Sequence, residues 1–171
     1  TAAEIDANTE LRDLLERIRG QAAFRMGMVD NPENATRDTP ATPILGMIAP
    51  PADYHNVLGN RTVKAEESDF ICRLMFMQQM HKTYAGTSTV CTGVASKLPG
   101  TIVYEAARPE CQDRLTTFFG HPAGVIETEA KVELSGNTWT ATRATVARTS
   151  RRIMEGYVFV PEWAEKLNVT S

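Results

Sequence analysis

The chain has 171 residues, of which 42% are hydrophobic and 23% charged, so a single domain of ordinary size can bury its own core. The formal net charge of −3 provides no basic field, so we expect neither a nucleic-acid partner nor attachment to an acidic membrane. Membrane-spanning helices are also excluded, because no apolar run approaches the roughly 18 residues they need.

The cysteine count bears on the compartment. Cys72, Cys91 and Cys111 lie far apart without Cys-x-x-Cys spacing, and an odd number argues against a closed disulfide framework. We therefore expect a reducing, cytoplasmic location. This expectation is provisional, because the chain opens at Thr1 without an initiator Met and an earlier leader could have been removed.

The first third of the chain predicts a helix, a loop and a strand. Between residues 6 and 24, apolar side chains recur at helical spacing and charges occupy the other face, which predicts an amphipathic helix capped by Asn8 or Thr9. Residues 30–43 are rich in Asn, Asp, Thr and Pro, which favours a surface loop. Residues 44–49 then read as a short buried strand.

The middle of the chain holds two apolar segments. Residues 70–77 are apolar at nearly every position, so periodicity does not separate a buried strand from a core helix, and we favour the strand slightly. Residues 86–97 predict a helix that ends before Pro99-Gly100. Its small residues suit close packing at the centre of a domain, with an apolar stripe formed by Val90, Cys91, Val94, Ala95 and Leu98.

The last third gives the clearest strand signal. Residues 126–134 alternate apolar and charged side chains, Gly136-Asn137 supplies a hairpin turn, and residues 138–147 return as a second strand. Further short strands are expected at 102–104, 115–119 and 157–160. The predicted fold class is α+β: one domain, residues 1–171, with a mainly antiparallel, curved sheet wrapped around a central helix.

The strongest candidate site lies where the central helix begins. There the unpaired N–H groups of Gly86, Thr87 and Ser88, with two hydroxyl groups, can hold a carboxylate. Plain helix capping by Thr or Ser explains the same residues and is the commoner case. His81, five residues earlier, can orient or protonate a substrate, although a structural histidine is at least as probable.

A second candidate is the 120–124 turn, Gly-His-Pro-Ala-Gly. The backbone around His121, Ala123 and Gly124 can form a small anion-binding nest, but a tight turn between strands explains it equally well. Arg25, which follows the first helix, is a third candidate for binding a carboxylate. We expect no metal, because the histidines are too dispersed, and no nucleotide loop or other cofactor motif is present.

Five segments together resemble a known family. In order, they are residues 22–29, 35–40, 48–54, 120–124 and 152–158. They are similar to the C-terminal half of the PrpF-like isomerases, the group that contains 2-methylaconitate cis-trans isomerase, methylitaconate Δ-isomerase and oxalomesaconate tautomerase. The resemblance spans nearly the whole chain.

This resemblance implies a diaminopimelate-epimerase-like fold, in which two similar domains each wrap a sheet around a central helix. It favours a strand at 70–77, and it implies proton transfer in small unsaturated acids without a metal or organic cofactor. The family's proposed catalytic lysine and cysteine belong to the N-terminal domain, which this sequence lacks. His81 and the helix start match the family pattern, whereas Ala123 stands where serine is common and Ala85 stands where related epimerases have a cysteine.

We therefore expect this chain to be the carboxylate-binding half of a cofactor-independent isomerase of aconitate-like di- and tricarboxylic acids, acting by an allylic proton shift or cis-trans isomerisation. Its partner would be the missing N-terminal domain, in the same or a separate chain. The sequence is also compatible with assembly into an oligomer. Alone it should be inactive. Half of an amino-acid racemase or epimerase, a small-anion binding module, and a scaffold with a vestigial pocket stay open as alternatives.

Overall fold

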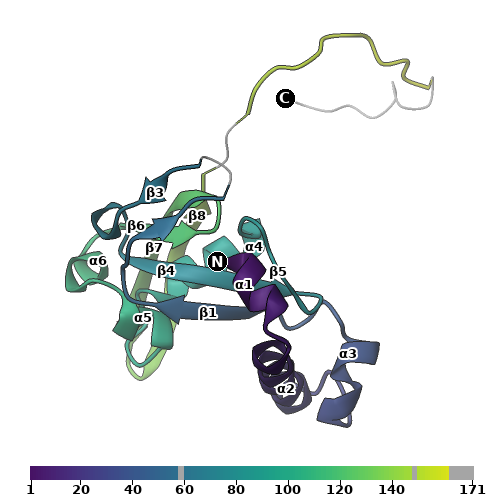
Figure 1. Cartoon of the computed structure of the whole chain (residues 1–171). Coiled ribbons are helices and arrows are strands. Elements are labelled where there is room, and N and C mark those ends of the chain that lie inside the picture. Colours follow the sequence, from purple (N-terminus) through teal and green to yellow (C-terminus); the bar gives the residue numbers. More distant parts are fainter. Residues whose placement is uncertain (58–59, 148–149, 162–171) are drawn as a thin grey trace.

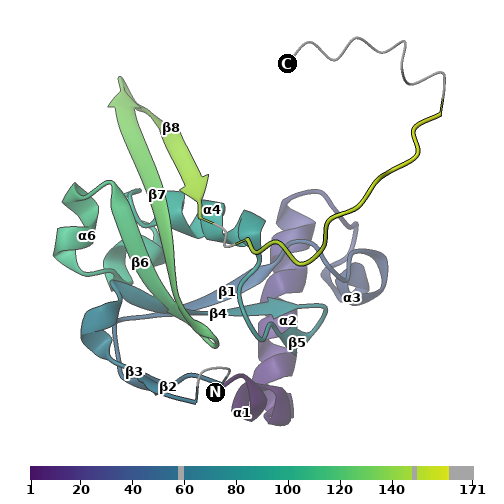
Figure 2. The ribbon, with the colours of Figure 1, turned by 90° about the horizontal axis from the view of Figure 1, so that it is seen from above.

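A computed structural model describes residues 1–57, 60–147 and 150–161. Within these ranges it has one curved six-stranded sheet in the order β1-β4-β6-β7-β8, with β5 also paired to β4. Figures 1 and 2 show this sheet from two directions. Its strands are β1 (Leu45–Ala49), β4 (Phe70–Phe76), β5 (Gln79–Met80), β6 (Thr116–His121), β7 (Gly124–Ser135) and β8 (Thr138–Val146).

All neighbouring strands of this sheet are antiparallel except β4 and β6, which run parallel. A separate two-stranded ladder joins β2 (Tyr54–His55) to β3 (Thr62–Val63). The mainly antiparallel α+β fold expected from the sequence is therefore confirmed. The strand at 70–77 and the 126–147 hairpin are confirmed with it, and Gly136 has the positive φ of 62° that its turn requires.

The helices differ more from expectation. They are α1 (Ala2–Ala7), α2 (Thr9–Arg25), α3 (Ala35–Asp38), α4 (Gly86–Ala95), α5 (Ile102–Ala106) and α6 (Pro109–Asp113), with 3-10 turns η1 (Pro32–Asn34) and η2 (Ala65–Glu67). The long first helix begins where a cap was expected, because the Asn8 side chain accepts from the Leu11 N–H at 3.0 Å. The loop at 30–43 contains η1 and α3, which the sequence did not indicate.

Helices cover both faces of the sheet. On one face, α1 and α2 pack on β4 and β5 through Leu15, Met75 and Met80. On the other, Phe70 and Phe119 stack with ring centres 5.3 Å apart in a core shared with Tyr84. The helix that follows β5, α4, packs on this side of the sheet against β7 and β8.

The orientation of α4 corrects the apolar stripe expected on it. The residues of α4 that are buried are Thr89, Thr92 and Gly93, while Cys91 of the expected stripe is exposed. A Cβ at Gly93 would lie 2.8 Å from Thr128 Cγ2 of β7, so only glycine allows this approach of helix to sheet. The sequence pattern favoured the wrong face because small polar residues can bury their hydroxyls by bonding to nearby groups.

Two expected strands are wrong. Residues 102–104 belong to α5, because the Thr101 side chain accepts from the Tyr104 N–H at 3.1 Å and caps a helix there. Residues 157–160 form no strand with the described part of the chain, and Tyr157 is fully exposed. A β-branched run predicts strand propensity, but a strand also needs a neighbour to pair with.

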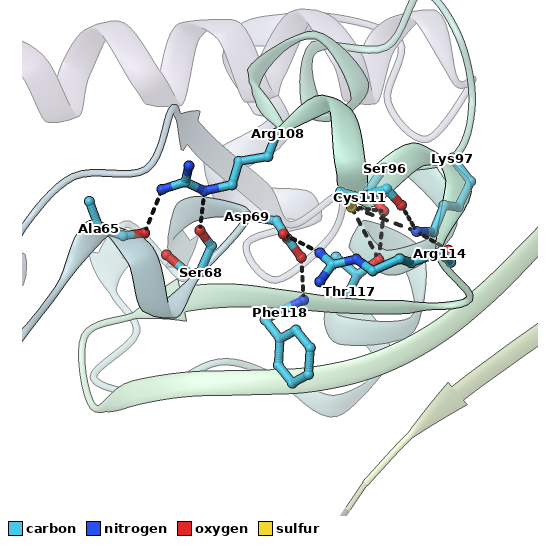
Figure 3. Close-up of polar contacts among 10 residues, drawn as sticks. All are labelled: Ala65, Ser68, Asp69, Ser96, Lys97, Arg108, Cys111, Arg114, Thr117 and Phe118. Carbon is cyan, nitrogen blue, oxygen red and sulfur yellow. Dashed lines mark hydrogen bonds and ion pairs between the residues drawn. The ribbon is translucent and has the colours of Figure 1, made fainter.

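A buried polar network fixes the opposite end of α4 (Figure 3). Lys97 donates from Nζ to the carbonyls of Cys111 and Arg114, the latter at 2.7 Å. Cys111 is fully buried there. Asp69 pairs with Arg114 and accepts from the Phe118 N–H at 2.8 Å, which anchors β6 beside β4. The network therefore fixes where β6 begins.

Candidate functional site

One edge of β4 is interrupted. β1 occupies the opposite edge, whereas this edge is shared: β6 pairs with the first two residues of β4, and β5 pairs with the last two. The His81 N–H also donates to the Leu74 carbonyl at 2.7 Å. Among the described residues, Cys72 and Arg73 thus have no strand beside them here, and we name this part the open β4 edge.

Arg73 brings a positive charge to the open β4 edge. Its Nη1 donates to the Cys72 carbonyl at 2.7 Å, and its guanidinium carbon lies 4.7 Å from the centre of the Tyr54 ring. Burial lowers the pKa of Arg73, and no carboxylate in the described part of the chain forms an ion pair with it. A partly buried guanidinium without a carboxylate is costly, and it suits a bound anion.

The 120–124 turn is fixed from outside by two side chains. Tyr54 donates from its hydroxyl to the Gly124 carbonyl, and Asn56 donates to the Ala123 carbonyl. Inside the turn, the Ala123 N–H donates to His121 Nδ1 at 3.3 Å. One N–H of the expected nest is therefore engaged, and the turn has the tight form that was its alternative. The imidazole of His121 is buried beside this turn, with 8% of the residue exposed.

Both histidines are held in a defined tautomer. Because His121 Nδ1 accepts from a backbone N–H, its proton is assigned to Nε2. Burial, assisted by the charges of Arg73 and His81, lowers the pKa of His121 to about 4, so it is a neutral Nε2–H donor at pH 7. His81 Nδ1 likewise accepts from the Thr83 N–H at 3.1 Å. The electrostatic influence of His81 and Arg73 on His121 shows that all three share one region.

The start of α4 carries no side-chain cap. Ala85 occupies the N-cap position, and no side chain bonds to the first N–H groups of the helix. Thr87 and Ser88 are the second and third residues of α4, and they line a mainly apolar cavity of about 560 Å³ together with Ile48 and Cys91. Simple capping by Thr or Ser, the common alternative, does not occur here. The exposed amide groups and the helix dipole make this end attractive to an anion.

Arg25 lies elsewhere. It is exposed in the last turn of α2, next to the C-cap Met26, and none of the described interactions joins it to the open β4 edge. Its role in binding stays a prediction. In the described ranges no group of three or more His, Cys, Asp or Glu side chains is arranged to hold a metal ion. No described helix is long and apolar enough to cross a membrane.

The chain is similar in sequence and in structure to known proteins. The model of the PrpF protein family matches residues 1–161. This chain belongs to the PrpF family. A crystal structure of methylitaconate-Δ-isomerase superposes on 92% of the chain with a TM-score of 0.79 and 39% sequence identity, which shows that the PrpF chain has the fold of part of that enzyme.

Curated PrpF relatives carry isomerase names. The 3-methylitaconate isomerase of Eubacterium barkeri is 41% identical over 91% of this chain, and the 2-methyl-aconitate isomerase of Shewanella oneidensis is 34% identical over 95%. The (4E)-oxalomesaconate Delta-isomerase of a Novosphingobium strain is 27% identical over 91%. The chain spans about 40% of the length of the first two relatives and 38% of the third.

Sequence reasoning missed two residues of this site, Arg73 and Tyr54. Arg73 is a lone charge inside the apolar run 70–77, and that isolation was the available signal, because a cation in a buried strand needs a reason. Tyr54 had no such signal. Its place is fixed by Gly120, where a Cβ would lie 2.8 Å from the Tyr54 ring and hydroxyl.

Proposed function

We propose that this chain is the carboxylate-binding lobe of a cofactor-independent isomerase acting on small unsaturated di- or tricarboxylic acids. The names of its PrpF relatives support the substrate class, and the uncapped α4 start and Arg73 support the role of this lobe. The activity belongs to a longer protein, because the relatives are about two and a half times as long as the matched part.

The chemistry asks for two contributions. A base removes a proton from a carbon next to an unsaturated carboxylate, the electron pair spreads over the allylic system onto the carboxylate oxygens, and a proton returns at another carbon or after rotation. In this chain, Arg73 and the amide groups of Gly86, Thr87 and Ser88 would hold the carboxylates. The charge that builds up on those oxygens is stabilised by donors already in place.

His121 suits the same task. Because it is neutral with a proton on Nε2, it can donate a hydrogen bond to a carboxylate oxygen without adding a charge that must be desolvated. His81, in the segment that leads into α4, would act as a second donor, because its Nδ1 accepts from the Thr83 N–H and leaves the proton on Nε2. The proton-transferring residues would lie in the part of the protein outside this chain, so binding without turnover is expected of the isolated chain.

The observation that carries this proposal is the partly buried Arg73 with no carboxylate partner in the described ranges. Titration calorimetry of the chain with trans-aconitate should show binding, and Arg73→Met should weaken it about 10- to 100-fold, because a hydrogen bond to a charged group contributes roughly 1.5–3 kcal/mol. Arg143→Met is the matched control: Arg143 pairs with Glu129 on the exposed hairpin. Equal affinities of the two variants would refute the assignment of Arg73.

A further inference from the structure

The side of α2 that faces away from the sheet carries exposed apolar side chains. Leu15 and Ala23 form the buried side of this helix, in two clusters of the core. Five large apolar side chains of α2 and of the turn after it are nevertheless between 39% and 60% exposed: Leu14, Ile18, Phe24, Met26 and Met28. Single exposed apolar residues are common, but a group of them on one helix marks an interaction surface. α2 lies at the margin of the molecule, where a partner can reach it (Figure 1).

Charged side chains without ion-pair partners lie on the same side of α2. Helical spacing places six exposed residues there, which we name the outer α2 face: Glu10, Leu14, Arg17, Ile18, Gln21 and Arg25. The acid lies in the first half of this face, and the two arginines lie in the second half. None of the three forms an ion pair in the described part of the chain. The helix dipole favours an acid first and bases last, but it does not account for Leu14 and Ile18 between them.

The outer α2 face is complementary to a second copy of itself. A twofold axis perpendicular to α2 sets two copies of the helix antiparallel, and every contact then occurs twice. Residues 10 and 25 are equally distant from the midpoint between Arg17 and Ile18, so Glu10 of each copy comes level with Arg25 of the other. The apolar Leu14 and Ile18 lie near the axis. The acidic half of each copy therefore lies beside the basic half of the other.

The surface beside Leu14 is also hollowed. A cavity of about 260 Å³ is lined by residues of the cap and the first half of the helix: Asn8, Glu10, Leu11, Leu14 and Arg17. In the antiparallel pair, this hollow comes level with residues 18–27 of the other copy, which include the exposed Ile18, Phe24 and Met26. Helices pack in this way, with a projecting side chain of one opposite a hollow of the other.

We propose that the outer α2 face is a self-association surface through which two copies of this chain pair about a twofold axis. At roughly 1.5 Å per residue, the 17 residues of α2 span about 25 Å. One helix pair of this length buries less than the roughly 800 Å² per partner of a standard interface, so the dimer should be weak, with a dissociation constant on the order of 10–100 µM. This inference does not depend on the proposed function.

Sedimentation equilibrium measures the association. Between about 5 and 500 µM, the mean mass should rise from that of a monomer toward that of a dimer. Ile18→Glu should leave a monomer throughout this range, because it places a charge at the apolar centre. Leu134→Glu is the matched control and should not change the association, since Leu134 is 54% exposed on the β7–β8 hairpin. The proposal is overturned by a wild-type chain that stays monomeric, which would leave this face to the rest of the longer protein, or by a dimer that tolerates Ile18→Glu.

Exchanging the charges separates pairing between copies from the helix dipole. Glu10→Arg and Arg25→Glu should each raise the dissociation constant about tenfold, because each reversal acts at two symmetric contacts and turns attraction into repulsion. The double variant restores opposite charges across the axis and should return the constant to near the wild-type value. It also opposes the helix dipole at both ends, so a double variant that associates more weakly than either single one would overturn the proposal. Circular dichroism of each variant reports that the helix content is kept.

Discussion

The close approach of α4 to β7 gives a quantitative test of the fold that positions the site. A methyl group at Gly93 would lie 2.8 Å from Thr128 Cγ2 and 3.0 Å from its Oγ1. Thr128 is 2% exposed, and its hydroxyl donates to the Thr145 carbonyl, so its side chain cannot turn away freely. Overpacking of this kind costs about 1–3 kcal/mol.

Helix propensity acts in the opposite direction. Alanine in a helix interior is favoured over glycine by about 1 kcal/mol, so Gly93→Ala should lower the free energy of unfolding by a net value of up to about 2 kcal/mol. Thr128→Ser removes the closest methyl group but keeps the hydroxyl. In the double variant, the two changes should therefore be less destabilising than their sum, by at least about 0.5 kcal/mol.

Urea unfolding followed by circular dichroism measures both quantities. Gly156→Ala is the matched control, because nothing lies within 4 Å of a Cβ at that exposed position, and its midpoint should equal that of the wild type. If Gly93→Ala is more stable than the wild type by about 1 kcal/mol, helix propensity alone governs this position, and the tight contact between α4 and β7 is refuted.

Three further results are expected. Thr87→Val combined with Ser88→Ala should weaken trans-aconitate binding by up to about 3 kcal/mol, measured by calorimetry, and unchanged affinity would move the anion away from the α4 start. Because the folded pKa of His121 is about 4, below the ordinary value of 6.5, its stabilising effect is complete above pH 6.5 and is lost as pH falls toward 4; about 2 kcal/mol should disappear between pH 7 and 5. His121→Asn should remove that part of the pH dependence of the urea midpoint, and an identical dependence in the variant would contradict the burial argument. With a thiol reagent, the native chain should show one reactive cysteine, the exposed Cys91, while a second fast-reacting thiol would contradict the burial of the other two.

Local signals predicted the elements that local interactions determine. The cap at Asn8, the hairpin turn at Gly136 and the alternation along β7 each depend on residues close in sequence, and the structure has all three. The strand expected at 157–160 does not form, because a strand needs a neighbour to pair with and these residues pair with no described strand. The buried face of α4 failed because Thr89 and Thr92 satisfy their hydroxyls internally, which a hydrophobic pattern cannot show.

The candidate site was predictable only in part. The start of α4 could be located because the beginning of a helix has a sequence signature. The alternative reading, a helix cap by the side chain of Thr or Ser, does not occur, because Ala85 is the N-cap residue. The open β4 edge could not be foreseen, because it exists only where β5 and β6 share one edge of β4. Arg73 owes its importance to that shared edge and to Tyr54, which reaches it from a different ladder.

Under the proposed function, the missing cap at Ala85 means that folding and ligand binding compete for the same amide groups. Serine or aspartate at position 85 would stabilise the helix by about 1 kcal/mol by bonding to the amides of the first turn. The same bond would take those donors from an incoming acid, and a carboxylate at 85 would also repel it. A residue at position 85 that increases the stability of the domain would therefore decrease its affinity for the acid. Alanine makes no such bond, so the amide donors stay available to the proposed ligand.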